Sequence, residues 1–198
     1  MSSVELESLM EDGTRVRGET RITASKGKIR ELFLVPPDVG PLPQTLEAIA
    51  SADLITIGPG SLFTSLIPNL LVWGISDAIL ESPAVTVFVC NLMTQANESL
   101  SLTAADHIRA LNGHAGVQLF DYALINRKAA SPEMKAKYAL EGASQIVVDL
   151  EAIEALGVCP VLGDYLEEGA VARHATNRAA HDLMALMAQA PDRQTIRS

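Results

Sequence analysis

The chain has 198 residues, 48% of them hydrophobic, and its formal net charge is -9. A chain of this length buries about 70% of the surface that its unfolded form exposes, so its core needs neither a disulfide nor a metal. The acidic balance argues against a protein that binds nucleic acid or a membrane surface, and we expect one domain over residues 1–198. Its two cysteines, Cys90 and Cys159, are too few for a disulfide framework, which favours a cytoplasmic location.

The N-terminal residues predict a β-hairpin. Residues Met1–Asp12 are acidic and fit either a helix or a strand. Apolar and charged residues alternate over Arg15–Ala24, Ser25–Gly27 suits a turn, and Lys28–Val35 is an apolar run. We therefore expect a hairpin within residues 13–36 that has one basic face. That face is either solvated or reaches over the edge of the main sheet.

Residues 44–190 predict a series of βα units. The expected strands are Asp53–Ile57, Val85–Cys90, Leu119–Ile125, Ile146–Asp149 and Val158–Leu162. The expected helices are Pro43–Ala50, Pro68–Leu80, Thr103–Leu111, Pro132–Leu140 and Ala170–Ala188. Thr103 and Asp106 have the spacing of a capping box. The alternation of short apolar strands with helices indicates an α/β fold whose mostly parallel sheet has helices on both faces.

The loop after the first of these strands carries the clearest binding pattern. Gly58-Pro-Gly-Ser61 matches a type II turn, in which Pro59 presets φ and Gly60 supplies the positive φ. Ser61 is then placed to cap a helical turn, and the hydroxyls of Thr64 and Ser65 follow. Backbone N–H groups, a helix N-terminus and hydroxyls together form an anion site without a cationic side chain. A tight turn that binds nothing fits the same pattern equally well.

The charge distribution agrees with such a site. No Lys or Arg occurs between Arg30 and Arg109, although eight acidic residues occur from Glu31 to Asp106. Any phosphate bound in this stretch must therefore be held by backbone groups, by hydroxyls, or by cations from elsewhere.

A second polar loop is expected at the same edge of the sheet. Asn91, Thr94 and Gln95 follow the strand Val85–Cys90, and Asn126 follows the next strand. Ligands of doubly wound folds bind at the carboxyl ends of parallel strands, where these side chains would suit a sugar, a base or a phosphate. A loop that only caps its own backbone is the alternative.

The histidines and Cys90 do not predict a metal site or a nucleophile. His107 and His114 are seven residues apart, as are His174 and His181, which places each pair on one face of a helix. Metal ligation favours closer spacing and a third ligand, so we expect no metal site. Cys90 follows a buried strand and is expected to be a core residue.

Two motifs in these loops resemble a known family. They are Gly58-Pro-Gly-Ser-Leu-Phe-Thr-Ser-Leu-Ile-Pro-Asn69-Leu-Leu-Val72 and Val89-Cys-Asn-Leu-Met-Thr-Gln95, followed by Ala105-Asp-His107. They are similar to the YvcK-like, or gluconeogenesis-factor, proteins, which are relatives of the 2-phospho-L-lactate transferase CofD. The resemblance extends more faintly through Arg15–Val35, Tyr138 and Arg173-His174.

The resemblance implies a Rossmann-like fold and a nucleotide-linked ligand. In the gluconeogenesis-factor branch it implies a UDP-sugar and a regulatory role in carbon metabolism and cell shape. In the transferase branch it implies phospholactyl transfer from a guanylyl donor to a deazaflavin, with Mg²⁺. Catalytic residues stay unassigned, and the predicted ligand-binding residues are Gly58, Pro59, Gly60, Ser61, Thr64, Ser65, Asn69, Asn91, Thr94 and Gln95.

Three departures from the family pattern matter. The family is longer at its N-terminus, where an Asp-Asp-Gly-Gly segment supplies acidic groups, so this chain resembles the C-terminal portion of a family member. Ala96-Asn-Glu-Ser99 replaces Pro-Gly-Glu-Thr, and Arg173-His-Ala175 replaces Arg-His-Asp. We expect this chain to lack transferase activity by itself. Its expected partners are a second copy or the missing N-terminal half.

Overall fold

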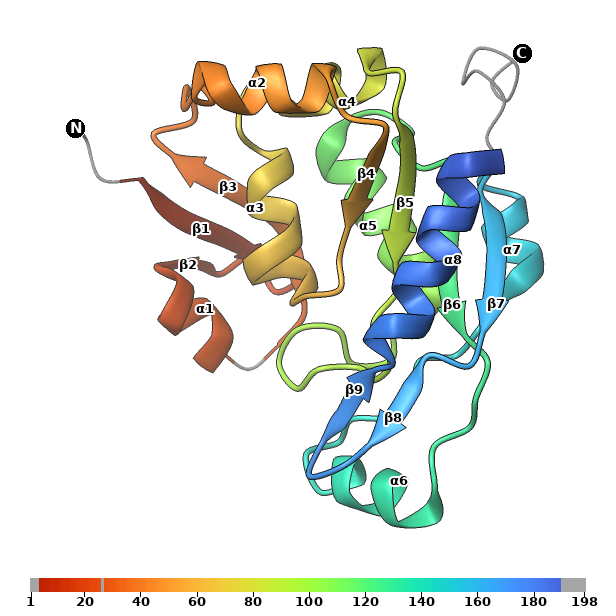
Figure 1. Cartoon of the computed structure of the whole chain (residues 1–198). Coiled ribbons are helices and arrows are strands. Elements are labelled where there is room, and N and C mark those ends of the chain that lie inside the picture. Colours follow the sequence, from red (N-terminus) through yellow and green to blue (C-terminus); the bar gives the residue numbers. More distant parts are fainter. Residues whose placement is uncertain (1–3, 26, 190–198) are drawn as a thin grey trace.

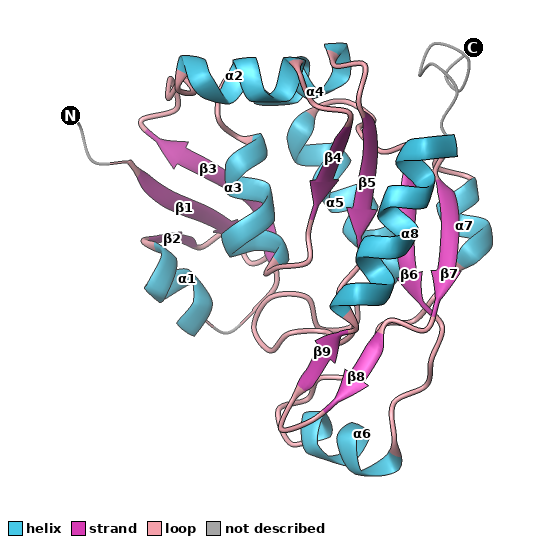
Figure 2. Ribbon diagram, in the orientation of Figure 1, coloured by secondary structure: helices cyan, strands magenta, loops and turns pink. Residues whose placement is uncertain are grey.

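The computed structural model describes residues 4–25 and 27–189. Its N-terminal part is a small antiparallel sheet of β1 (Glu5–Met10), β2 (Arg15–Arg17) and β3 (Ile29–Val35), in the order β2-β1-β3. A short helix, α1 (Glu19–Ala24), lies between β2 and β3. This sheet lies beside the main sheet in Figure 2.

The predicted hairpin is wrong in its pairing. Arg15–Ala24 contributes only the three residues of β2 before the chain turns into α1, and β1 is the central strand, pairing with both neighbours. Residues alternate in β1, so that Leu6, Ser8 and Met10 on one face of the strand are buried. The turn predicted at Ser25–Gly27 includes residue 26, which lies outside the described residues.

The basic face of the N-terminal sheet is paired with acids of β1. Arg15 Nη1 lies 2.5 Å from Glu7 Oε1, and Arg17 forms an ion pair with Glu5. The Arg15 guanidinium also lies over the ring of Phe33. These two cations therefore contact their own sheet.

The main sheet has four parallel strands in the order β4-β5-β6-β7. They are β4 (Leu54–Ile57), β5 (Val85–Val89), β6 (Tyr122–Asn126) and β7 (Cys159–Gly163). Figure 1 shows α8 (Thr176–Gln189) against one face and α5 (Ala104–Ala115) against the other. The α/β fold with a parallel sheet flanked by helices is confirmed.

Both faces of the sheet are apolar, as a doubly covered parallel sheet requires. Every residue of β5 is buried. Val85, Val87 and Val89 pack in the cluster that includes residues of α8, whereas Phe88 packs with residues of α5. The capping box predicted for Thr103 and Asp106 is present at the start of α5.

Two other predicted elements differ from the structure. Ile146–Asp149 is not a strand, because Asp149 is the N-cap of α7 (Leu150–Glu154) and accepts a hydrogen bond from Ala105 N. The fourth strand is instead β7. The helix predicted at Pro68–Leu80 is broken by Gly74, which has φ 82°. It consists of α3 (Ile67–Leu70) and α4 (Ile75–Glu81), and a π-helical turn, η1 (Leu62–Leu66), precedes it.

The C-terminal helix begins later than predicted. Residues Ala172–His174 form β9, which pairs with β8 (Leu166–Glu168), and α8 begins at Thr176. The helices α2 (Pro43–Ala50) and α6 (Pro132–Ala139) lie where the sequence predicts them. In the described part of the chain no single helix is long and apolar enough to cross a membrane. One bent pair, Leu62–Leu70 with Ile75–Glu81, meets the length and composition criteria together.

Candidate functional site

The loops after β4 and β5 line a common hollow, which we call the loop pocket. It has a volume of about 420 Å³. Its walls come from these two loops, from the C-terminal end of α6 and from β9. The lining residues are Pro59, Gly60, Ser61, Asn91, Leu92, Met93, Thr94, Gln95, Tyr138, Ala172 and His174. Six of the predicted ligand-binding residues therefore lie together in one pocket.

Side chains of the second loop hold the first loop in place. Asn91 Oδ1 accepts from Gly60 N at 3.1 Å, and Asn91 Nδ2 donates to Gly60 O at 2.8 Å. Gln95 Nε2 donates to Ser61 Oγ at 3.0 Å. Because Asn91 makes both bonds to protein backbone, its amide positions the loop, and Gly60 N is not a free donor for an anion.

Gly58 is the residue whose conformation the loop requires. Its φ is 96°, and a Cβ placed there would lie 2.5 Å from Val89 O. The predicted type II turn is therefore wrong, since the positive φ belongs to Gly58 and not to Gly60. The physical reason is that the chain passes directly over the end of β5, where only a residue without a Cβ fits.

The N-terminal end of η1 is occupied by a carboxylate of the chain itself. Thr64 Oγ1 donates to Glu98 Oε1 at 2.5 Å, and the backbone N–H of Phe63 also bonds that carboxylate. Ser61 is at the N-cap but its side chain makes no capping bond. Burial raises the pKa of Glu98, which is only 8% exposed. Glu98 thus lies where the sequence predicts a bound anion.

The other predicted residues have structural partners. Thr94 Oγ1 accepts from Ser144 N at 2.9 Å, inside the wall of the loop pocket. Asn69 Nδ2 donates to Ser65 O at 2.7 Å. Thr64, Ser65 and Asn69 lie outside the lining of the loop pocket. Their role in ligand binding stays a prediction.

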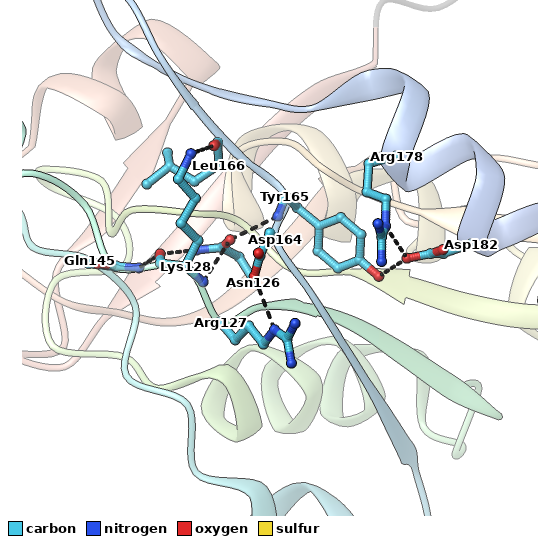
Figure 3. A network of polar contacts seen from close by, with 9 residues as sticks. All are labelled: Asn126, Arg127, Lys128, Gln145, Asp164, Tyr165, Leu166, Arg178 and Asp182. Atoms are coloured by element: carbon cyan, nitrogen blue, oxygen red, sulfur yellow. Dashed lines mark hydrogen bonds and ion pairs between the residues drawn. The ribbon is translucent and has the colours of Figure 1, made fainter.

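Asn126 is also part of a structural network, shown in Figure 3. Its Oδ1 accepts from Lys128 N at 3.2 Å and from Tyr165 N at 3.0 Å. The hydroxyl of Tyr165 donates to Asp182 Oδ2 at 2.8 Å, and Arg178 Nε bonds the same oxygen. This network ties the ends of β6 and β7 to α8, and Asn126 does not line the loop pocket.

The structure adds residues that sequence reasoning did not place in the site. Tyr138 comes from α6, and its hydroxyl oxygen accepts from Ala172 N at 3.2 Å. His174 comes from β9, and its Nε2 lies 3.0 Å from Cys90 O. Because a carbonyl only accepts, Nε2 carries the proton and Nδ1 is an acceptor. The only signal for these residues was the fainter part of the family resemblance.

The loop pocket has no formally charged wall. Among its lining residues there is no Lys, Arg, Asp or Glu. Burial lowers the pKa of His174, which favours its neutral form. Ser61 Oγ accepts from Gln95 and keeps its own hydrogen for donation, while Gln95 Oε1 is buried without a partner. The arrangement suits an uncharged ligand rich in hydroxyls.

The histidines and cysteines agree only in part with their predictions. His107 Nδ1 and His114 Nδ1 bond carbonyls one turn earlier in α5, at 2.7 and 2.8 Å. His174 lies in β9 and His181 in α8, so the predicted common helix face for this pair is wrong. Cys90 is buried, as predicted, and burial raises the pKa of its thiol to about 12. That thiol is not an activated nucleophile.

No group of three or more His, Cys, Asp or Glu in residues 4–25 and 27–189 could hold a metal ion. Mg²⁺ prefers carboxylate oxygens and water, whereas the polar groups of the loop pocket are hydroxyls, amides and an imidazole.

Comparison with known proteins gives consistent matches. The family model described as 2-phospho-L-lactate transferase CofD matches residues 1–166. A gluconeogenesis factor from Bacillus subtilis is 43% identical over 188 residues, which are 94% of this chain and 59% of that protein. One from Halalkalibacterium halodurans is 45% identical over 92% of this chain and 57% of that protein. A crystal structure of a UPF0052-family protein from Bacillus halodurans matches with a TM-score of 0.89 and 44% identity. That match covers 92% of this chain and 59% of the other.

Proposed function

Because the chain belongs to the CofD family and its loop pocket is polar but uncharged, we propose that it binds the sugar of a UDP-sugar there. Its role in this proposal is regulatory, in carbon metabolism and cell shape, in the cytoplasm. The observation that carries the proposal is the neutral polar wall, on which Ser61 Oγ keeps a hydrogen to donate. The relatives named gluconeogenesis factor support the regulatory role.

The chemistry of a sugar matches the groups on the wall. Each sugar hydroxyl both donates and accepts, so it needs both kinds of partner. Ser61 and Tyr138 have hydroxyl hydrogens to donate, because both of their oxygens already accept bonds from the protein. His174 Nδ1 is an acceptor, because Nε2 donates to Cys90 O. A volume of about 420 Å³ lies within the ordinary range of small-molecule sites.

The diphosphate of the ligand would lie outside the loop pocket. Arg173 lies between two lining residues, Ala172 and His174, so the alternation of β9 turns its side chain to the other face. This chain spans less than two thirds of the relatives' length. We therefore propose that the diphosphate meets solvent or residues beyond the matched span.

The name of the matching family model favours a second function, phospholactyl transfer from a guanylyl donor to a deazaflavin. That chemistry would use Mg²⁺ held by carboxylates, and no carboxylate lines the loop pocket. We propose that this chain does not perform the transfer by itself. Phospholactyl transfer by the 198-residue chain would overturn that part of the proposal.

Calorimetric titration with UDP-N-acetylglucosamine and with UDP tests the function. If the sugar occupies the loop pocket, the nucleotide-sugar binds more tightly than UDP does. Equal affinities for the two ligands would place the sugar outside the pocket and contradict the proposal.

A further inference from the structure

A further hollow, which we call the β3 pocket, lies between the N-terminal sheet and α5. Residues of β3, η1 and α5 line it. Its volume is about 670 Å³, which is larger than that of the loop pocket, and the two hollows share no lining residue. A ligand of the β3 pocket would therefore be independent of the sugar proposed above.

The buried part of the wall is apolar. Leu32 of β3 is 1% exposed, and Phe63 of η1 is 5% exposed. Phe33 and Leu102 are partly buried and add aromatic and aliphatic surface. Small-molecule sites are lined mainly by such side chains, with a few polar groups that orient the ligand. This part of the wall suits the apolar body of a small molecule.

Two arginines that are far apart in the sequence both line this pocket. Arg30 and Arg109 are the cations at either end of the stretch without Lys or Arg. Arg30 has no opposite residue on β1, because the pairing of β1 with β3 shifts register there. Such a bulge turns a side chain out of the regular alternation of a strand. The fold thus brings both cations to one hollow.

The arginine on α5 is held by a carboxylate of the same helix. Arg109 Nη1 donates to Asp106 Oδ1 at 2.8 Å, and Asp106 Oδ2 accepts from Thr103 N at 3.1 Å in the capping box. Both carboxylate oxygens of Asp106 therefore have partners in the protein. A guanidinium has five N–H groups, so its bond to Asp106 leaves Arg109 with donors for a ligand.

The arginine on β3 is exposed. No carboxylate in residues 4–25 and 27–189 forms an ion pair with Arg30. Glu31 and Asp106 also line the pocket, so the wall carries two positive and two negative side chains. Since a phosphate monoester carries a charge of about -1.5 to -2, this balance favours a ligand with a single negative charge.

The edge of β3 that faces α5 is not open to another strand. Leu32 N donates to His114 Nε2 at 3.1 Å, and His114 Nδ1 lies 2.8 Å from Ala110 O. The imidazole thus links β3 to α5 and occupies an N–H group that an added strand would need. The β3 pocket therefore suits a small molecule better than a peptide.

We propose that the β3 pocket binds a small organic carboxylate with an aromatic or aliphatic body. The guanidinium groups of Arg30 and Arg109 supply the N–H donors, because a planar fork of N–H groups matches the two oxygens of a carboxylate. The body lies against the apolar wall that includes Leu32 and Phe63. This site goes beyond the proposed sugar site and does not depend on it.

Two probes of nearly the same shape test this. Naphthalene-2-carboxylate and the uncharged naphthalene-2-carboxamide are titrated into the 198-residue chain, and the backbone amide signals are followed by NMR spectroscopy. We expect the carboxylate to bind about fivefold more tightly or better, because only its charge-assisted hydrogen bonds distinguish the two probes. The amides of Ile29–Phe33 and Ala110–His114 should shift, and 2-naphthyl phosphate should bind no more tightly than the carboxylate.

Substitutions of the charged residues sharpen the test. Arg30→Gln and Arg109→Gln should each weaken carboxylate binding by about 3- to 10-fold and leave carboxamide binding unchanged. Arg127→Gln is the matched control, because Arg127 is also exposed and forms an ion pair with Asp164 but does not line the pocket. Glu31→Gln should strengthen carboxylate binding, because it removes a like charge from the wall.

Three outcomes would overturn the proposal. The first is a carboxylate that binds no more tightly than the carboxamide. The second is an equal loss of carboxylate affinity in Arg30→Gln and in Arg127→Gln. The third is a set of amide shifts that leaves out both Ile29–Phe33 and Ala110–His114, because the probe would then bind elsewhere.

Discussion

The loop pocket and another hollow of about 480 Å³ along the edge of β4, which we call the β4 groove, have different walls. The pocket lies at the carboxyl end of β4, where Gly58-Pro-Gly-Ser61 brings backbone and hydroxyl groups to the surface. The groove lies along the edge of β4, where Ile55 and Ile57 are only partly covered. A few residues thus change the wall from a polar one to an aliphatic one.

The two regions also differ in how their walls are held. Hydrogen bonds that involve Asn91, Gln95 and Glu98 join the second loop to the first, in and beside the pocket. The groove is lined mostly by aliphatic side chains from α2, β4 and α3. Directional bonds fix the wall of the pocket, whereas packing fixes most of the wall of the groove.

The largest effect should come from the glycine that starts the first loop. Gly58→Ala places a Cβ against Val89 O at positive φ, so we expect the free energy of unfolding to fall by about 3 kcal/mol. Gly116→Ala is the matched control, because Gly116 also has positive φ but nothing lies within 4 Å of its added Cβ. It should cost about 1 kcal/mol. Urea unfolding measures both changes. If the two variants lose the same free energy of unfolding, the contact between the added Cβ and Val89 O does not explain the loss at Gly58.

Asn91 tests whether the pocket wall depends on side-chain bonds. Asn91→Ala removes both bonds to Gly60 and should lower the free energy of unfolding by about 1 to 3 kcal/mol. Asn91→Asp keeps the acceptor for Gly60 N but sets a carboxylate oxygen against Gly60 O, so it should lose stability too. An alanine variant as stable as the wild type would show that the loop holds its shape without this residue.

Acidification should weaken the fold through its buried histidines. Burial lowers the pKa of His107 and of His174 in the folded state from the ordinary value of 6.5. Below pH 6.5 the unfolded chain therefore binds more protons than the folded chain. The free energy of unfolding is largest above pH 6.5 and falls as the pH drops below it. His174→Gln, which can still donate to Cys90 O, should flatten this fall. An identical pH profile of unfolding in the variant would contradict a buried neutral His174.

The main sheet could be predicted because its signals are local. The strands β4, β5 and β7 are short runs rich in aliphatic residues, and α5 begins at a capping box that the sequence shows directly. The carboxyl ends of parallel strands meet at one edge, so the approach of Ser61 to Gln95 followed from the fold class.

The remaining features depend on contacts between distant residues. The central position of β1 and the pairing of β8 with β9 depend on which strands pair, and the pattern within one segment does not predict its partner strand. Gly58 has a positive φ, and Val89 O of β5 leaves no room for a Cβ there. Turn statistics consider only the residues of the turn and therefore miss this contact. Tyr138 and His174 reach the loop pocket from α6 and β9, so periodicity does not place them there.

The most direct test of the account is a comparison of two ligands on three proteins. UDP-N-acetylglucosamine and UDP are titrated into the wild type, Tyr138→Phe and Ser61→Ala. Each substitution removes one hydroxyl from the loop pocket, so the nucleotide-sugar should bind about 2- to 10-fold more weakly while UDP binds as before. Affinities that fall equally for both ligands, or for neither, would contradict a sugar in the loop pocket.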